Sequence, residues 1–330
     1  MPIDAGDIGS RVVIRSRLPG RTGPSGGPAL TDVIGELETY DDTTAVVMRR
    51  DGTRVSVPVV DVVAAKRVPG TRSGGLKIGA DDLQRICAAG WPAPVLEPLG
   101  DWMLRAAGGF TRRANSALVA GDPGLSMTEA LLQVSEFYHR HGLPPRAQVV
   151  VGSTAEESLA QHAWSGIGEP RGGALVMVAT LHTAPTAPGS DVAVELAGRV
   201  DERWLAMYNR AGGHDPTLAR ALLEGPDRVA FARIGEPPVA IGRMVVTEAW
   251  AGLSAVEVLP ELRRTGMATA VVAALQQWAI GAGGRWCYLQ VTDDNTAALT
   301  LWRRHGFRHH HSYRYLAPRD QVQKTVSAGR

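Results

Sequence analysis

One short segment of this 330-residue chain has the residue types needed to hold a phosphate group. An apolar run ends at Leu259, Pro260 interrupts the strand's hydrogen-bond ladder, and a helix is expected to open near Thr265 and Gly266. Backbone amides at the start of a helix carry partial positive charge and suit an anion, which a glycine allows to approach closely. The segment Val256 to Ala268 therefore predicts an anion site, although an ordinary strand-to-helix turn with two solvated arginines has the same composition.

This segment resembles the pyrophosphate loop of the GNAT superfamily of N-acetyltransferases. Residues Arg263 to Ala268 match its Arg/Gln-x-x-Gly-x-Gly/Ala pattern, and Val258-Leu259-Pro260 matches the end of its fourth strand. Residues Asn295 to Phe307 are similar to its Asn-x-x-Ala-x-x-Leu-Tyr-x-x-x-Gly-Phe element. The two motifs occur in the family's order and at its separation, and the resemblance covers roughly residues 190 to 330.

The resemblance implies a GNAT fold that takes acetyl-CoA as acyl donor, without a metal. The backbone at Val256, Glu257 and Val258 would bond the pantetheine arm, and the neighbouring strand would part from it at Leu289 to Val291. The other implied contacts with the cofactor are Arg263, Arg264, Thr265, Gly266, Met267, Ala268 and Thr269 at the pyrophosphate, and Asn295 and Trp302 in the second motif.

Amine acetylation needs an acid that protonates the leaving thiolate, and this acid is the first catalytic group to be considered. The family often has a tyrosine where this chain has Trp302, whose indole has no proton to transfer near neutral pH. Tyr313 is the candidate acid, with Tyr315 beside it and solvent as the alternatives. Tyrosine is also common as a packed strand residue, which is the competing interpretation for both side chains.

The base that deprotonates the amine is the second catalytic group. Glu257 is the candidate because it is the only carboxylate inside the fourth strand, and it should point away from the face of Val256 and Val258. The family's usual glutamate lies earlier, where this chain has Ala251 to Ser254, so a salt-bridged or solvated Glu257 is the alternative. His309 to His311 titrate in a suitable range, but a solvated edge strand is the simpler interpretation.

An internal repeat accounts for the middle of the chain. Met127 matches Met267, 140 residues further along, and similar apolar matches continue without a gap. Two amphipathic units of the same type would match in this way by chance, but duplication is favoured. In the first copy Pro123 and Ser126 replace Arg263 and Gly266. This half, residues 76 to 189, is therefore predicted to be a degenerate GNAT-like domain that does not bind the cofactor, as in mycothiol synthase-like members of the family.

Helices and strands must alternate to position these motifs. Helices are predicted over residues 126–141, 154–164, 201–211, 217–223, 266–282 and 295–305, and strands over residues 228–234, 239–247 and 253–258. The fold class is therefore α/β (α+β), with a mixed, mostly antiparallel sheet. The polar or aromatic residues of the first half that could meet substrate are Trp102, Arg105, Arg113 and Asn115, although packing roles are the simpler interpretation for each.

The first 72 residues have no long helical pattern. Short strands are predicted over residues 11–15, 32–38, 43–49, 53–58 and 59–68, with a loop from Pro19 to Pro28 and a tight turn at Asp51-Gly52. Several short strands of this kind indicate a small SH3-like or Tudor-like β-barrel over residues 1–72. Residues 71–75 are a linker, and residues 190–330 form the catalytic domain.

Composition narrows the functional classes. A net charge of +2 without a basic stripe argues against nucleic acid as the partner. The N-terminus lacks a signal-peptide core, and no apolar run is long enough to span a membrane, so a cytoplasmic, soluble protein is expected. Cys87 and Cys287 are expected to be buried free thiols.

Three functions remain open. The first is transfer of acetyl from acetyl-CoA to a small-molecule amine or a protein or peptide amine, by a monomer or homodimer. The second is a coenzyme A-binding regulatory or adaptor protein without turnover, which the missing tyrosine favours. The third is a nucleic-acid or protein-tail reader that acts through the N-terminal barrel, where protein is the better partner because the charges there are balanced.

Overall fold

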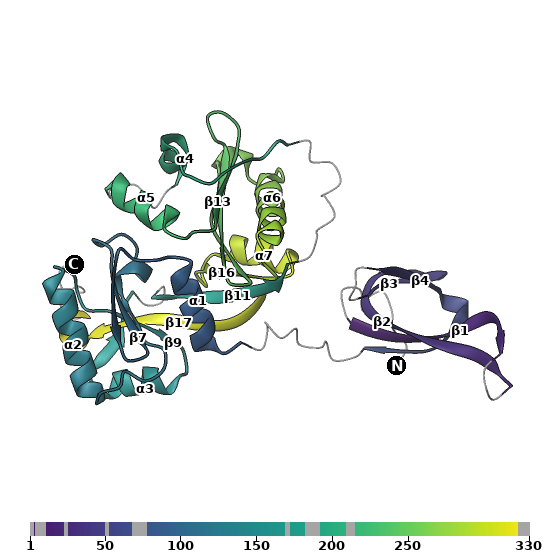
Figure 1. Ribbon diagram of the computed structural model, residues 1–330, viewed down its shortest axis with the longest axis horizontal. Coiled ribbons are helices and arrows are strands. Elements are labelled where there is room, and N and C mark those ends of the chain that lie inside the picture. The colour runs from purple at the N-terminus through teal and green to yellow at the C-terminus, as the bar shows by residue number, and fades with distance from the viewer. Residues whose placement is uncertain are drawn as a thin grey trace. The chain divides into compact units, whose positions relative to one another are not determined.

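A computed structural model describes residue 3 and residues 11–22, 26–49, 53–67, 78–168, 172–181, 192–208 and 215–322. The chain divides into two compact units, Met1–Lys77 and Ile78–Arg330, and Figure 1 labels the elements of both. No helix in the described ranges is both long enough and apolar enough to cross a membrane.

The N-terminal unit is a five-stranded antiparallel sheet with the order β4-β3-β2-β1-β5. Its strands are β1 (Arg11–Thr22), β2 (Pro28–Tyr40), β3 (Thr44–Met48), β4 (Arg54–Pro58) and β5 (Val62–Arg67). Alternate residues such as Val12, Ile14, Val33 and Val47 form its core, as the period of a strand requires. The predicted strands and the β3–β4 pairing are therefore confirmed, except that Val59–Asp61 form a 3-10 helix and β5 begins only at Val62.

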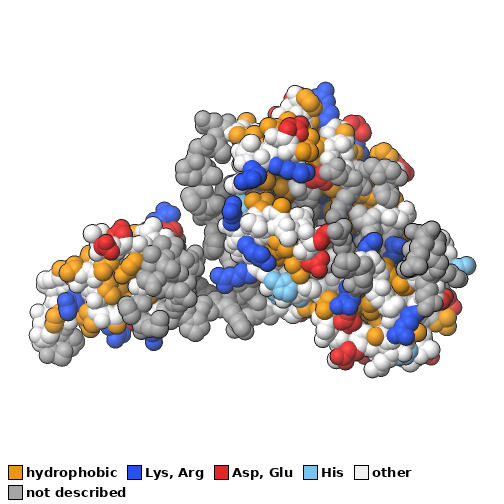
Figure 2. Space-filling model, turned by 180° about the vertical axis from the view of Figure 1, so that it is seen from behind, with side chains coloured by type: hydrophobic (Ala, Val, Ile, Leu, Met, Phe, Trp, Pro, Cys, Tyr) orange, Lys and Arg blue, Asp and Glu red, His pale blue; other side chains and the backbone are white. Residues whose placement is uncertain are grey.

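Two features of the predicted N-terminal unit differ or stay open. The loop predicted from Pro19 to Pro28 is shorter, because β1 continues to Thr22. The turn at Asp51-Gly52 lies outside the described residues. Among the described strands, β4 and β5 form the sheet's two edges and no pairing closes them into a barrel. Figure 2 shows apolar side chains exposed on this unit beside charged ones, and Leu30, Ile34, Val60 and Val63 are among the exposed apolar residues.

The larger unit contains the order of three strands, helix, strand, helix and strand twice, once in each half. The first half contains α1 (Ala80–Ala89), β6 (Val95–Leu99), β7 (Trp102–Ala106), β8 (Ala117–Leu118), α2 (Met127–Arg140), β9 (Ala147–Val150), α3 (Thr154–Gln161), β10 (Trp164–Gly166) and β11 (Gly173–Thr180). The second contains β12 (Glu195–Ala197), α4 (Glu202–Met207), α5 (Pro216–Glu224), β13 (Val229–Ile234), β14 (Ala240–Thr247), β15 (Trp250–Val258), α6 (Met267–Gly281), β16 (Trp286–Val291), α7 (Thr296–Arg304) and β17 (Arg308–Pro318).

The predicted helices are observed with small differences in length. Helices α2 and α6 begin at the matched residues Met127 and Met267. Helix α3 ends at Gln161 instead of Trp164, because Ala163 adopts a positive φ of 61° that a helix cannot continue. Helix α4 is observed to Met207, and the end of its predicted range lies outside the described residues.

The two halves share one mixed sheet because their last strands cross over. Strand β11 of the first half lies between β16 and β17, and the far end of β17 pairs with β9 and β10. Figure 1 shows β17 as one long yellow strand that extends from the second half into the first. Among the strands that the structure describes, parallel pairing occurs once in each half, between β8 and β9 and between β15 and β16. The division of this unit at residue 190 stays a prediction.

Apolar clusters cover both faces of the second half's sheet. Helices α6 and α7 pack against one face through residues such as Val271, Leu275 and Leu299. Helices α4 and α5 cover the other face together with Trp91 and Phe110 of the first half. The first half therefore completes the core of the second on the face away from α6.

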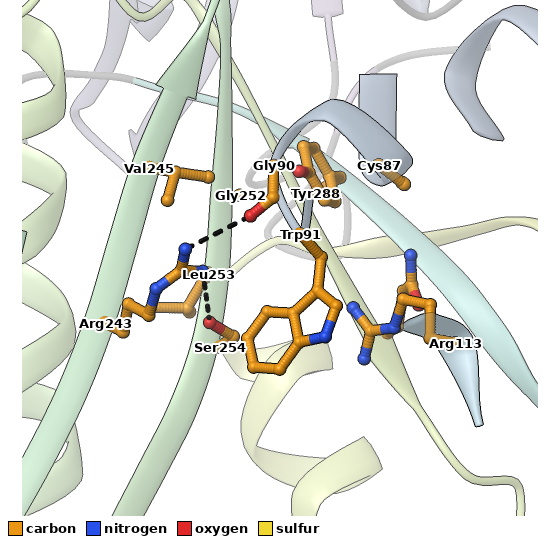
Figure 3. A pocket seen from close by; sticks show the side chains of 11 residues that line it. Cys87, Gly90, Trp91, Arg113, Arg243, Val245, Gly252, Leu253, Ser254 and Tyr288 are labelled. Atoms are coloured by element: carbon orange, nitrogen blue, oxygen red, sulfur yellow. Dashed lines mark hydrogen bonds between the residues drawn. The ribbon is translucent and has the colours of Figure 1, made fainter. Parts of the chain in front are cut away.

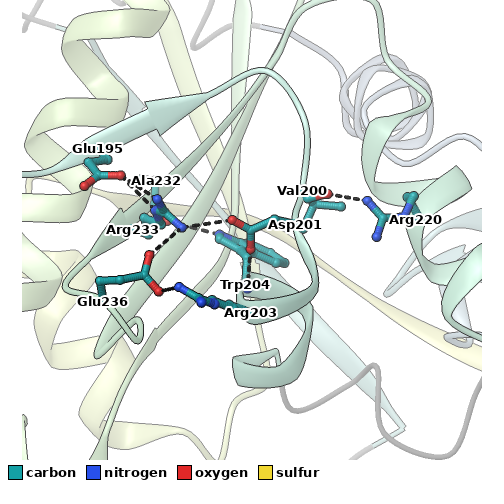
Figure 4. A network of polar contacts seen from close by, with 9 residues as sticks. All are labelled: Glu195, Val200, Asp201, Arg203, Trp204, Arg220, Ala232, Arg233 and Glu236. Atoms are coloured by element: carbon teal, nitrogen blue, oxygen red, sulfur yellow. Dashed lines mark hydrogen bonds and ion pairs between the residues drawn. The ribbon is translucent and has the colours of Figure 1, made fainter.

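Ionic contacts fix α4 against the edge of the sheet, as Figure 4 shows. Arg233 of β13 pairs with Glu195 of β12 at 2.7 Å and with Asp201 at 2.9 Å. Asp201 also caps α4 by accepting a hydrogen bond from the Trp204 amide at 2.7 Å. Glu236 bridges Arg233 and Arg203 beside them. These contacts hold α4 over the face of the sheet opposite α6.

Candidate active site

The start of α6 is an uncapped helix N-terminus. Gly266 occupies the N-cap position with a φ of +93°, no side chain caps the helix, and its first turn contains no acid. A Cβ added at Gly266 would have no atom within 4 Å, so the space in front of the helix is open. Arg263 and Arg264 are exposed in the turn before it. Free amides and two cations at one helix start form a site for an anion.

The corresponding start of α2 is closed by its own side chains. Ser126 accepts a hydrogen bond from the Glu129 amide, and the Glu129 carboxylate accepts from the Ser126 amide at 3.2 Å. This capping box satisfies the amides that α6 leaves open, and it places a negative charge in the first turn. The same position of the two halves therefore provides an anion site only in the second.

Strands β15 and β16 part beside this helix. They pair in parallel from Trp250 with Trp286 to Leu253 with Leu289, and beyond that point they no longer pair with each other, although β15 stays paired with β14 and β16 with β11. Between Ser254 and Glu257 the pairing of β15 with β14 contains a β-bulge, where Ala255 has a φ of +53°. The edge of β15 that no longer pairs with β16 is the place where a ligand could bond the backbone. The predicted parting at Leu289 to Val291 is therefore observed.

The bulge leaves Val256 and Val258 on the face of α6, where both pack against its apolar cluster. Glu257 pairs with Ile241, which belongs to the cluster on the opposite face, and the Glu257 side chain is half-buried. The predicted orientation of Glu257 agrees with this placement.

A small cavity lies on that opposite face where the strands part. Its volume is about 20 Å³, enough for a group the size of one water molecule. It is lined from both halves of the unit, and the residues concerned are Cys87, Gly90, Trp91, Arg113, Arg243, Val245, Gly252, Leu253, Ser254, Tyr288 and Gln290. Figure 3 shows the Trp91 ring between the side chains of Arg113 and Arg243. The guanidinium carbons lie 5.1 and 5.0 Å from the ring centroid, a cation–π geometry.

Burial sets the protonation of the groups around the cavity. It raises the pKa of the Cys87 thiol to about 12 and holds the pKa of Tyr288 well above its ordinary value. It also lowers the pKa of Arg243 to about 10. At neutral pH the thiol and phenol are therefore neutral, and the guanidinium is charged.

The candidate acid and the cavity are linked by one hydrogen bond. The Tyr313 hydroxyl donates to Gln290 Oε1 at 2.9 Å, and Gln290 lines the cavity. Tyr315 is packed edge-on against Tyr313, and burial holds its pKa well above the ordinary value. Tyr313 is thus placed next to the parted strands, as Glu257 is on β15.

The second motif has mainly structural contacts in the described chain. Asn295 caps α7 by accepting a hydrogen bond from the Ala298 amide at 3.1 Å. Trp302 is 7% exposed and packs in the core on Phe307, with ring centroids 5.9 Å apart. Contact of either residue with the cofactor stays a prediction.

The first-half residues considered for substrate contact have different environments. Trp102, Arg105 and Asn115 are buried and hydrogen-bonded within the first half, which agrees with packing roles. Arg113 instead lines the cavity. Trp91, Arg243 and Gln290 were not identified from the sequence, because only the fold brings them together. In the described chain no three His, Cys, Asp or Glu side chains gather as a metal ion would require.

Comparison with known proteins supports this architecture. Residues 81–316 match a family described as "Probable histone acetyltransferase Rv0428c C-terminal", and residues 6–66 match the "Rv0428c N-terminal Sm-like domain". The Mycobacterium tuberculosis protein "Probable histone acetyltransferase Rv0428c" is 32% identical over 326 residues, covering 94% of this chain and 95% of the relative. The Bacillus subtilis "Uncharacterized N-acetyltransferase YobR" is 27% identical over 68% of this chain and 93% of its own length.

Two solved structures share the fold of the larger unit. A GCN5-related N-acetyltransferase from Kribbella flavida has a TM-score of 0.54 at 14% identity, over 72% of this chain and 95% of its own. A tandem GNAT protein from the clavulanic acid biosynthesis pathway has a TM-score of 0.51 at 10% identity, over 71% and 86%. The tandem GNAT prediction is therefore confirmed, and the names of the relatives favour an enzyme over a coenzyme A-binding adaptor. The chain belongs to the Rv0428c acetyltransferase family and is a GNAT-type N-acetyltransferase with an N-terminal Sm-like domain.

Proposed function

We propose that the second half of the larger unit transfers an acetyl group from acetyl-CoA to the amine of an acceptor. The observation that carries this proposal is the uncapped start of α6, with Arg263 and Arg264 before it. This helix start follows the end of β15, which no longer pairs with β16 there. The pyrophosphate would bind the free amides from Arg264 to Thr269, and the pantetheine arm would run along Val256 to Val258.

Direct attack of a neutral amine on the thioester forms the new C–N bond and releases the thiolate of coenzyme A. Glu257 would accept the amine's proton, directly or through water, from the face of the sheet opposite α6. Tyr313 would return a proton to the thiolate, and its present hydrogen bond to Gln290 holds the hydroxyl beside the parted strands.

The acceptor class is the part of the function that the donor site does not determine. The Mycobacterium tuberculosis relative is named as a histone acetyltransferase, which makes a lysine amine of a protein one candidate. A small-molecule amine is the other. The cavity beside Ser254 and Gln290 is where the acceptor would approach the thioester.

Gly266→Asp tests the donor site, with Ser126→Ala as its matched control at the start of α2. The new carboxylate would occupy the α6 amides and repel pyrophosphate, so we expect the KM for acetyl-CoA to rise at least about tenfold. Ser126→Ala should cost about 1 kcal/mol of stability and leave this KM unchanged. The measurement is thiol release from acetyl-CoA with lysine peptides and small primary amines. Tight coenzyme A binding with no thiol release from any amine would contradict the proposal.

A further inference from the structure

Arg105 and Arg243 are buried in the larger unit and Arg113 is half-buried, and the three differ in how their charge is satisfied. Arg105 donates to the Ser116 carbonyl and to Gln148 Oε1, both at 2.8 Å. Arg243 donates to the Leu223 carbonyl at 2.8 Å. No ion pair with Asp or Glu involves Arg105, Arg113 or Arg243 in the described ranges. The interior around the cavity therefore carries positive charge without a fixed anion.

Arg113 is the least satisfied of the three. Its Nε is buried and has no hydrogen-bond partner among the described residues. The ionisable groups that interact with it include Tyr313, Tyr315, Cys87, Tyr208 and Arg105, and none of these is a carboxylate. Burying a guanidinium without an anion is costly, and stacking on Trp91 offsets only part of that cost.

A second poorly satisfied donor lines the same cavity. Gln290 Nε2 is buried with only the Cys87 sulfur, a weak acceptor, beside it, while Tyr313 donates to Oε1 of the same amide. Two buried N–H donors without a strong acceptor, next to the charge of Arg243, match a group with two acceptor oxygens and a negative charge. A carboxylate has that chemistry.

The position of the cavity indicates which molecule brings the carboxylate. Ser254 and Gln290 line it at the point where β15 and β16 part, whereas the anion site for the pyrophosphate is at the start of α6 on the opposite face. We infer that the acceptor is an amine carrying a carboxylate a few bonds from the reacting nitrogen, and that Arg113 and Gln290 bind this carboxylate beside the charge of Arg243. The inference rests on the proposed acetyl transfer.

Binding can be measured without turnover. Formate and formamide have nearly the same size, but only formate is charged, so they are suitable probes for the full chain with coenzyme A bound. The Nε–H resonance of Arg113 is assigned by its loss in Arg113→Lys. We expect formate to shift this resonance saturably and formamide to leave it in place. A resonance that responds to neither probe, or equally to both, would overturn the inference.

Turnover then tests the acceptor class with pairs of amino acids and their carboxamides. We expect kcat/KM for the acid to exceed that for its amide at least about tenfold, the discrimination that hydrogen bonds to a charged group provide. Arg113→Gln should abolish this preference by lowering kcat/KM for the acid at least about tenfold more than kcat/KM for the amide. Arg113→Lys should restore part of the preference, and Arg112→Gln, an exposed neighbour with the same change of charge, should retain it.

The outcomes separate the two proposals. If no amine is acetylated but formate still binds at Arg113, the proposed acetyl transfer is contradicted and the proposed carboxylate site is supported. If acids and amides react equally, or if a lysine peptide with blocked ends is the better acceptor, the proposed carboxylate site is contradicted and the proposed acetyl transfer is supported. Equal losses for acid and amide in Arg113→Gln would also overturn the inference, because they would mean that Arg113 acts on the thioester or on folding.

Discussion

At the scale of single residues, the side chain at the N-cap position of a helix distinguishes the two halves of the larger unit. Ser126 closes the start of α2 with a capping box, whereas Gly266 leaves the start of α6 open and lets the chain adopt a φ of +93°. This difference could be inferred from the sequence, because capping residues act locally. The partners of Arg113 and Gln290 could not, since those residues meet only after folding.

The substitution Glu257→Gln tests whether this single side chain is the general base for the amine. Loss of a general base lowers kcat by about a hundredfold or more, and the KM for acetyl-CoA should stay within about twofold because the backbone of β15 is kept. Glu248→Gln is the control, since Glu248 is exposed at the other end of β15. Steady-state thiol release measures both variants. An unchanged kcat in Glu257→Gln would assign the base to another group or to solvent.

At the scale of elements, the parting of β15 and β16 and the long strand β17 position the site. Gly252 lets Tyr288 lie across β15, because a Cβ on it would come within 2.4 Å of the Tyr288 hydroxyl. Strand β17 carries three consecutive histidines with different environments. His309 is exposed, whereas His311 is 8% exposed and its Nε2 accepts from Gln84 Nε2 at 2.8 Å. The sequence predicted a solvated edge strand here, and His311 is buried because β17 crosses into the first half.

The burial of His311 predicts how stability depends on pH. Burial lowers the pKa of His311 to about 4, below the value of about 6.5 expected in the unfolded chain. The folded state therefore favours neutral His311, and its contribution is complete above pH 6.5 and is lost as the pH falls towards 4. Its neighbours His309 and His310 are also titratable and disfavour the charged form.

We expect His311→Gln to reduce the loss of unfolding free energy between about pH 6.5 and pH 4, because a glutamine has no proton to gain. His309→Gln is the control, and it should retain the slope of the unsubstituted protein. Urea unfolding at a series of pH values measures this. If the unfolding free energy of His311→Gln falls with pH as steeply as that of the unsubstituted protein, other groups cause the loss of stability at acid pH.

At the scale of the whole molecule, the two halves of the larger unit depend on each other's strands. Strand β11 completes the sheet of the second half, and β17 completes that of the first. Trp91 and Phe110 of the first half also lie in the core beneath α4 and α5. The first half thus contributes to the fold and to the lining of the cavity, while the start of its helix α2 is closed by a capping box.

We therefore expect residues 190–330 alone to lack a cooperative unfolding transition, because β16 and β17 would lose the strand between them and expose unpaired edges. Residues 78–330 should unfold in one transition, as a single compact unit does. Tryptophan fluorescence in urea measures both. Cooperative unfolding and coenzyme A binding by residues 190–330 alone would contradict the expectation.

The anion site proposed at the start of α6, the repeat and most elements were predictable from the sequence. These depend on local rules, namely the turn from Pro260 to Gly266, helical and strand periodicity, and caps, so they could be identified without a fold. The strand exchange, the interior position of Trp302, and the cavity where Arg113, Arg243 and Gln290 meet became visible only in the fold. Such contacts depend on which distant segments pack together, and no spacing along the chain encodes that directly.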